Sequence, residues 1–191
     1  MPSIFEECGN YLAQHPDDSK SIHEQIRLLD FDSFTDLLEE ALYSYQELYL
    51  EENRDSQVSQ KLEITSLILI LCIKCAIENQ QAGKWSQAGV GKILFATFNE
   101  LLIYNNNIQL INSFLEIPLI QGNLDSIKSE SIHQALAKGH FAVVQQVMSC
   151  SAAVNKDNQA KHLHFIEKIV GNLILSGNLN CRIDKINKII V

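Results

Sequence analysis

Apolar residues recur every three or four positions along most of this 191-residue chain, and this period is typical of helices that bury one face. The expected helices span 3–14, 21–30, 33–53, 61–79, 88–104, 107–117, 129–138, 141–149, 158–175 and 181–190. The alternation with a period of two that marks strands is weak throughout. The pattern therefore predicts an all-α fold.

Three of the early helices are expected to begin at a serine that is followed, three residues later, by an acidic residue. The pairs are Ser3 with Glu6, Ser21 with Glu24, and Ser33 with Asp36. In such a capping box the hydroxyl accepts a hydrogen bond from the third backbone N–H, and the carboxylate lies near the positive end of the helix. We therefore expect these serines to be the N-caps.

The segment KLEITSLILILCIKCAIEN, residues 61–79, is apolar on nearly all sides. Its apolar stretch from Thr65 to Ile77 covers 13 residues and contains Lys74, whereas a membrane span needs about 20 apolar residues. It is therefore expected to be a buried central helix. The glycine-rich stretch that follows should connect an acidic helical unit, 1–80, to a second helical unit, 88–191, within one continuous domain.

An apolar pattern in the second half of the chain returns after 33 residues. Ile108, Leu110, Ile111, Phe114 and Leu115 are repeated as Phe141, Val143, Val144, Val147 and Met148. A period of 33 residues is typical of ankyrin repeats, in which neighbouring helix pairs bury their faces only by stacking. Gly139 is expected to end the first helix of its pair with a positive φ, and Asn106 occupies that place upstream.

The segment ESIHQALAKGHFAVVQQVM, residues 130–148, resembles an ankyrin repeat in detail. The matching positions are Ile132, His133, Ala135, Gly139, His140, Val143, Val144, Val154 and Asn155. The upstream copy matches only in its second helix, and a third, ragged start lies at 161–172. The resemblance is to divergent ankyrin-repeat proteins of intracellular bacterial pathogens. It implies stacked helical hairpins in the C-terminal half, an N-terminal helical cap, and a role in binding proteins.

Charge is distributed unevenly along the chain. Residues 1–60 carry fourteen acidic and three basic residues, which gives −11, and the remainder carries nine acidic and twelve basic residues, which gives +3. This asymmetry predicts a basic or amphipathic helical segment of another protein as the partner, and it disfavours nucleic acid and anionic membranes. The candidate contact residues are Glu39, Glu40, Glu47 and Glu51. The alternative is that the acidity only provides solubility.

Trp85 is the single tryptophan, and it has two possible roles, a lid on the core or a binding anchor. Cys72 and Cys75 form a C-x-x-C in the middle of an apolar helix, where thiolates are not stabilised, so we expect core packing. No catalytic motif, cofactor site or metal site is predicted. Five cysteines without regular spacing and an acidic N-terminus favour a cytoplasmic protein.

Together these features predict a non-enzymatic protein-interaction module. By size and acidity the chain is also similar to the small, acidic, helical adaptors and chaperones of type IV secretion systems. Two alternatives stay open. One is a translocated effector that binds a protein in the host cytosol, and the other is an enzyme whose site no motif reveals.

Overall fold

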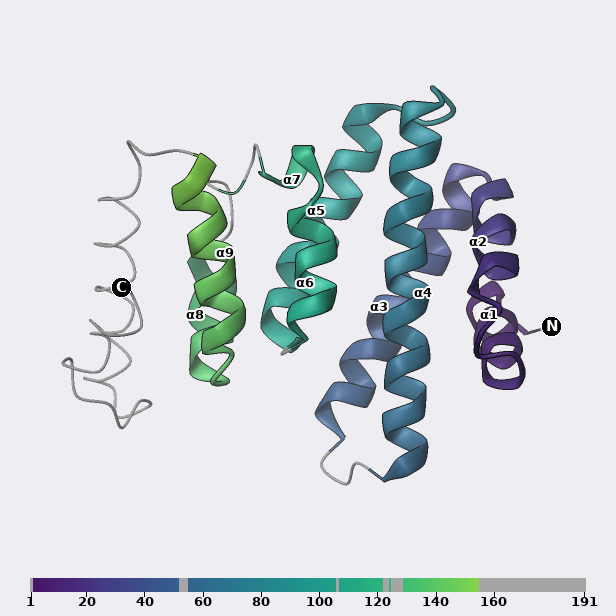
Figure 1. Cartoon of the computed structure of the whole chain (residues 1–191), viewed down its shortest axis with the longest axis horizontal. Coiled ribbons are helices and arrows are strands. Elements are labelled where there is room, and N and C mark those ends of the chain that lie inside the picture. Colours follow the sequence, from purple (N-terminus) through teal and green to yellow (C-terminus); the bar gives the residue numbers. More distant parts are fainter. Residues whose placement is uncertain (1, 52–54, 106, 122–123, 125–128, 155–191) are drawn as a thin grey trace. The chain divides into compact units, whose positions relative to one another are not determined.

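The computed structural model describes residues 2–51, 55–105, 107–121, 124 and 129–154, and the chain divides into two compact units, Met1–Thr97 and Phe98–Val191 (Figure 1). The boundary falls inside helix α5, Gln87–Tyr104. The described residues form helices and no strand, so the predicted all-α fold is confirmed for them. The helices expected over 158–175 and 181–190 lie outside the described residues.

Unit 1 is built around its longest helix. The helices are α1 (Ile4–Gln14), α2 (Ser19–Leu28), α3 (Phe31–Leu50) and α4 (Ser56–Gln81), followed by the first part of α5. Helices α1, α2 and α3 all pack against α4, whose side chains Ile68, Leu69, Cys72, Cys75 and Ala76 are fully buried. The prediction of a buried central helix is confirmed, because three helices pack against α4 and cover these side chains.

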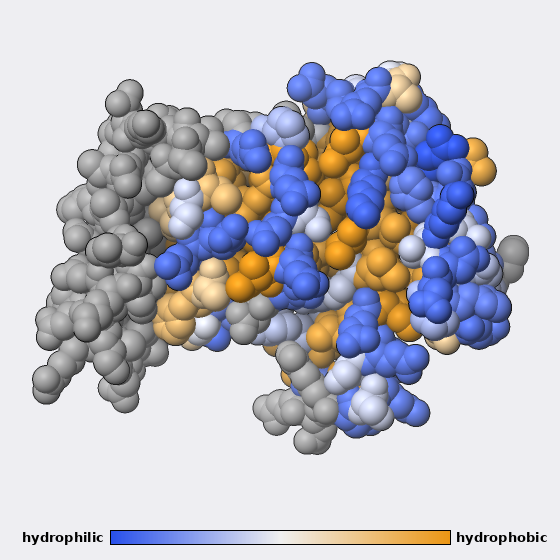
Figure 2. Space-filling view, viewed as in Figure 1, coloured by the Kyte–Doolittle hydropathy of each residue, from blue (hydrophilic) through white to orange (hydrophobic). Residues whose placement is uncertain are grey.

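The remaining face of α4 is partly apolar. Figure 2 shows hydrophobic residues along the visible face of α4, whereas hydrophilic residues dominate over α1 and α2. Leu67 and Ile70 are half-buried there, between the exposed charges of Glu63 and Lys74. Within the described part of the chain, no helix combines the length and the apolar character that crossing a bilayer requires.

Two of the three predicted N-caps are wrong. Ser3 caps α1 in a capping box as expected. Helices α2 and α3, however, begin two residues earlier than expected, and their N-caps are Asp18 and Asp30. The backbone N–H groups of Ser21 and Ser33 donate to those carboxylates at 3.3 and 2.8 Å. A charged carboxylate accepts more strongly than a hydroxyl at the positive end of a helix, so the aspartate three residues upstream takes the cap.

Unit 2 contains the end of α5, then α6 (Ile108–Leu115), α7 (Pro118–Gln121), α8 (Ser129–Ala137) and α9 (Phe141–Val154). The pairs α5–α6 and α8–α9 keep the same register. Their first helices end at Tyr104 and Ala137, and their second helices begin at Ile108 and Phe141. Each pair of boundaries is 33 residues apart. Helix α6 packs against α9, as expected for stacked hairpins, while the ankyrin family itself stays a prediction.

The 33-residue correspondence also includes the first helices of the two hairpins. Phe98, Asn99, Leu102 and Ile103 of α5 are buried, and their counterparts Ser131, Ile132, Ala135 and Leu136 in α8 are buried too. Leu101 is also buried, whereas its counterpart Gln134 is half-buried. The match is not evident in the sequence, because corresponding positions differ in side-chain size, as for Phe98 and Ser131 or Leu102 and Ala135. Four of the five buried positions in this part of α5 are nevertheless buried in α8 as well.

The prediction for Gly139 is confirmed. Its φ is +81°, its N–H donates to the carbonyl of Leu136 at 3.0 Å, and it follows the end of α8. The N–H of His140 then reaches back to the carbonyl of Ala135 at 2.9 Å. This pair of backward bonds is the usual end of a helix at a left-handed residue. The upstream counterpart, Asn106, lies outside the described residues.

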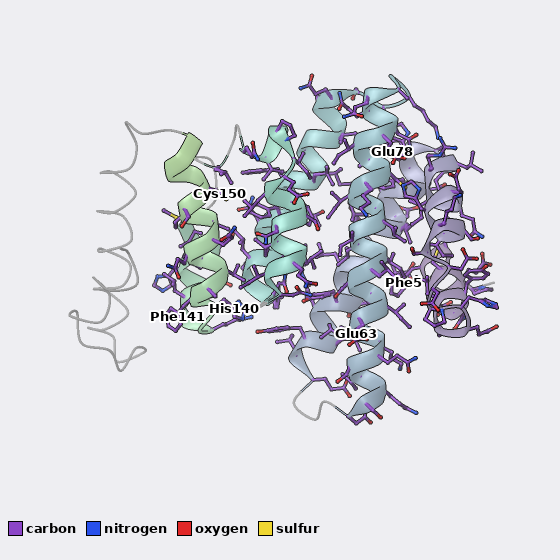
Figure 3. All side chains as sticks on the ribbon, in the orientation of Figure 1. Phe5, Glu63, Glu78, His140, Phe141 and Cys150 are labelled. Atoms are coloured by element: carbon purple, nitrogen blue, oxygen red, sulfur yellow. The ribbon has the colours of Figure 1, made fainter. Side chains whose placement is uncertain are left out.

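His140 links the two hairpins of unit 2. Figure 3 shows it at the start of α9, beside Phe141. Its side chain is buried, and Nδ1 donates to the carbonyl of Leu102 in α5 at 3.4 Å. Burial lowers the pKa of His140, the hydrogen bond to Leu102 partly opposes that effect, and nearby Lys138 adds to it. The imidazole is therefore neutral in the folded unit at neutral pH.

Candidate protein-binding surface

Helix α3 divides cleanly into an inner and an outer face. On the inner face, the buried residues are Phe34, Leu37, Leu38, Ala41 and Tyr45, which face the core of unit 1. After Asp32 in the first turn, the exposed residues opposite them, with the C-cap of the helix, are Asp36, Glu39, Tyr43, Glu47, Leu50 and Glu51. Steps of three and four residues align this second set along one side of the helix. We refer to these six residues as the outer face of α3.

The outer face of α3 carries four carboxylates, on Asp36, Glu39, Glu47 and Glu51. None of them forms an ion pair with a lysine, arginine or histidine among the described residues. The fifteen steps from Asp36 to Glu51 correspond to about 22 Å along the helix axis. Exposed like charges at this density repel one another and create a negative potential beside the helix, which a cationic partner would relieve.

Two apolar side chains interrupt the carboxylates. Tyr43 is 61% exposed and Leu50 is 60% exposed, and they are separated by seven residues, which is two helical turns. The phenol of Tyr43 is hydrogen-bonded to the carboxylate of Glu47, and this bond raises the pKa of the phenol. The contact with Glu47 favours one placement of the tyrosine ring along the outer face of α3.

Glu40, one of the predicted contact residues, is separate from the others. It is half-buried, whereas Glu39, Glu47 and Glu51 are exposed. Its Oε1 accepts a hydrogen bond from the hydroxyl of Ser3 at 2.7 Å. Because Ser3 is also the N-cap of α1, this carboxylate fastens the start of α1 to the middle of α3. Its position is structural, while Glu39, Glu47 and Glu51 remain together on the outer face of α3.

Trp85 lies in the core of unit 1, with only 7% of its surface exposed. Its ring packs against Phe34 and Phe31, with centroids 4.6 and 5.4 Å away. Both distances lie in the range of favourable aromatic pairs. Of the two roles considered for Trp85, this burial fits the lid on the core. A tryptophan in a connector gave no sequence signal to distinguish the two.

The connector before α5 fastens the C-terminal end of α2, an arrangement that the sequence did not reveal. The ammonium of Lys84 donates to the carbonyls of Arg27 and Leu29 at 3.0 and 2.8 Å. The side chain of Asn79 donates to the Arg27 carbonyl at 3.2 Å, and its own backbone carbonyl accepts from Lys84 and Trp85. A cation and an amide thus satisfy carbonyl groups that a helix end leaves unpaired.

The cysteines of unit 1 are buried thiols. Burial raises the pKa of Cys8 to about 11 and that of Cys75 to about 12, and it raises the pKa of Cys72 as well. The sulfur of Cys75 lies 3.4 Å from the backbone carbonyl of His23. Thiols with such raised pKa values are poor nucleophiles and poor metal ligands. Within the described ranges, no three His, Cys, Asp or Glu side chains are grouped as a metal site requires.

The partly apolar face of α4 around Leu67 and Ile70 is a weaker candidate for a protein-binding surface than the outer face of α3. Figure 3 shows Glu63 and Glu78 on this helix. Lys74 lies between them in the sequence, so the charges around Leu67 and Ile70 have both signs and favour no particular partner.

No protein-family model, no curated protein and no solved structure matches the chain. The function is therefore argued from the surfaces of the molecule itself.

Proposed function

We propose that this protein is a non-enzymatic interaction module that recruits a basic segment of another protein to the outer face of α3. The observation that supports the proposal is the row of exposed carboxylates on Asp36, Glu39, Glu47 and Glu51, which lack a cationic partner among the described residues. Charges placed in this way act mainly on the rate of association, since they attract an oppositely charged partner before contact. At physiological salt their reach is about 8 Å.

The sign of the surface selects the class of partner. Nucleic acid and the anionic leaflet of a membrane are repelled by a negative potential. A protein segment that is rich in lysine and arginine is attracted. Unit 2 adds stacked helical hairpins, an architecture whose resemblance to ankyrin repeats also implies protein binding. The proposed setting is that of a small acidic adaptor in a type IV secretion system, in the bacterial cytoplasm.

Affinity capture from a lysate of the native host tests this proposal when it compares matched variants. In the first variant, Glu39, Glu47 and Glu51 are changed to lysine. The control variant changes Asp17, Glu63 and Glu116 to lysine; these residues are also exposed but lie outside α3. Both variants therefore alter the net charge by the same amount. We expect the parent and the control to retain a partner that the first variant loses.

Capture of the same partners by all three proteins would contradict the proposal, because partner binding would then not depend on the carboxylates of the outer face of α3. If the partner lost by the first variant is a bacterial secretion component, the adaptor setting is supported. A host protein in its place would support the effector setting instead. With the recovered partner, reversal of the three glutamates should slow association at least about fivefold at low salt.

A further inference from the structure

We propose that the segment recruited to the outer face of α3 is a cationic amphipathic helix, anchored by its apolar side chains on Tyr43 and Leu50. This inference rests on the proposed function and adds to it the two residues that hold the partner in place and the form that the partner takes. Neither residue is acidic, so the charge pattern of the sequence does not point to either of them.

Tyr43 and Leu50 are distinguished by their exposure. Among the described large apolar side chains that are exposed, Ile4, Ile108 and Phe141 lie between 36 and 40%, while Tyr43 and Leu50 exceed these values by about half. Leu28 is more exposed still, at 76%, but it stands at the last residue of α2. Single exposed apolar residues are ordinary. Two on one face of one helix form a stripe that a partner can cover.

The spacing of the stripe fits a helix. Seven residues separate Tyr43 from Leu50, so their side chains point the same way about 10 Å apart along the axis. A partner helix that repeats an apolar residue every seven positions presents its side chains at the same interval. Two helices packed in this way lie about 8–10 Å apart, which is close enough to cover both side chains. An extended peptide rises about 3.3 Å per residue, so side chains on one of its sides recur about every 6.6 Å and do not match the interval of about 10 Å between Tyr43 and Leu50.

The charges around the stripe define the sign of the partner. Glu39 precedes Tyr43 by four residues, Glu47 lies between the two apolar residues, and Glu51 follows Leu50. Lysine or arginine beside the apolar positions of the partner would face these carboxylates, as in paired helices whose flanking charges set partner choice. A second copy of this chain is disfavoured, because two outer faces of α3 would bring like charges together.

Tyr43 is prepared for this role by its neighbour. The phenol lies within hydrogen-bonding reach of Glu47, and that contact favours one placement of the ring before any partner arrives. A side chain that is already ordered loses less conformational entropy on binding. Tyrosine is also a residue type in which binding energy is often concentrated. The two apolar residues should therefore govern how long the complex lasts, whereas the carboxylates govern how fast it forms.

Binding of two designed peptides to the full chain tests the inference. The first peptide is a helix of about three heptads with leucine at positions a and d and lysine at positions e and g. The second has the same composition in a scrambled order that removes the apolar stripe. Tyr43 and Leu50 are changed together to glutamine, a good helix former, and the control changes Leu28 and Ile108 to glutamine. Circular dichroism and Trp85 fluorescence verify that both variants are folded.

We expect the heptad peptide to dissociate at least about tenfold more slowly than the scrambled one, a difference of about 1.4 kcal/mol. The Tyr43→Gln/Leu50→Gln variant should remove that advantage and leave the association rate within about twofold, and the control should match the parent. Equal dissociation of the two peptides, or of the variant and the control, would overturn the inference.

That failure is distinguishable from failure of the proposed function. If both peptides bind equally and reversal of Glu39, Glu47 and Glu51 slows their association, charge alone recruits the partner, and the proposed function survives without the anchors. If neither peptide depends on those three glutamates, or neither binds, the proposed function fails as well. If Tyr43→Gln/Leu50→Gln does not fold, Tyr43→Gln alone, which leaves the net charge unchanged, serves as the second variant and carries the same expectation.

Discussion

The glycines of unit 1 allow the same chemical change to be made in two backbone environments. Gly9 lies inside α1, and Gly83 follows the end of α4 with a φ of +71°. A methyl group added at either position would meet no atom within 4 Å beyond its own neighbourhood. Substitution by alanine therefore tests the backbone alone, because no clash contributes at either site.

The two substitutions are expected to have opposite signs. Alanine at position 9 should stabilise unit 1 by about 0.5–1 kcal/mol, since glycine inside a helix costs that much relative to alanine. Alanine at position 83 should destabilise it by about 1–2 kcal/mol, because the Cβ of an L-residue is strained in the left-handed region. The difference between the variants is thus about 2 kcal/mol. With a urea m-value of about 2 kcal/mol/M, the two midpoints should lie about 1 M apart.

Urea unfolding followed by tryptophan fluorescence measures this difference, since the single tryptophan, Trp85, reports on unit 1. Circular dichroism at equilibrium provides an independent trace, which matters because Gly83 lies close to the reporter in the sequence. If Gly83→Ala stabilises the unit, or if both variants shift the midpoint in the same direction, the positive φ at Gly83 and the capping arrangement that follows it are wrong.

Four further changes have defined outcomes. Gly139→Val should cost unit 2 on the order of 1–2 kcal/mol, measured by circular dichroism, through left-handed strain, since the φ of Gly139 is +81° and an added Cβ itself would meet no atom closer than 3.9 Å. Trp85→Ala should lower the free energy of unfolding of unit 1 by about 3–5 kcal/mol in the same assay, and a loss below about 1 kcal/mol would contradict its place in the core. His140 is neutral when buried, so the unfolded chain takes up a proton near pH 6.5 before the folded unit does; unit 2 should therefore keep its stability above that pH and lose it toward pH 5, and His140→Asn should flatten the melting temperature against pH. A thiol reagent should leave Cys72 and Cys75 unmodified in native buffer and modify both in denaturant, as mass spectrometry would detect; rapid native labelling would contradict their raised pKa values.

Much of the fold could be predicted from the sequence because burial imposes a period on the residues. The apolar run of α4 indicated a central helix, and the neighbours of Ile68 and Leu69 account for it. The 33-residue return of apolar positions located the second helices of both hairpins. It missed the first helices, because Phe98 and Ser131 fill equivalent buried places with very different volumes. Periodicity identifies which positions are buried, and it does not determine how large the side chains must be.

The site was predicted less well, since its details depend on contacts between distant segments. The sequence grouped Glu40 with Glu39, and only the contact with Ser3, thirty-seven residues away, separates them. Trp85 had two possible roles until the rings of Phe31 and Phe34 were placed beside it. The N-caps of α2 and α3 depend only on nearby residues, and the prediction was wrong there because it chose a serine over the aspartate three residues earlier.

The central claim is that the outer face of α3 touches the partner. Site-specific photo-crosslinking in the native host tests it most directly, with the crosslinking residue placed at Tyr43 or Glu47 and, as controls, at Lys20 or Lys74, which are exposed on α2 and α4. We expect one partner to be joined at Tyr43 and at Glu47 and not at the control positions. A partner that joins equally at Lys20 and Lys74, or that joins only there, would contradict it.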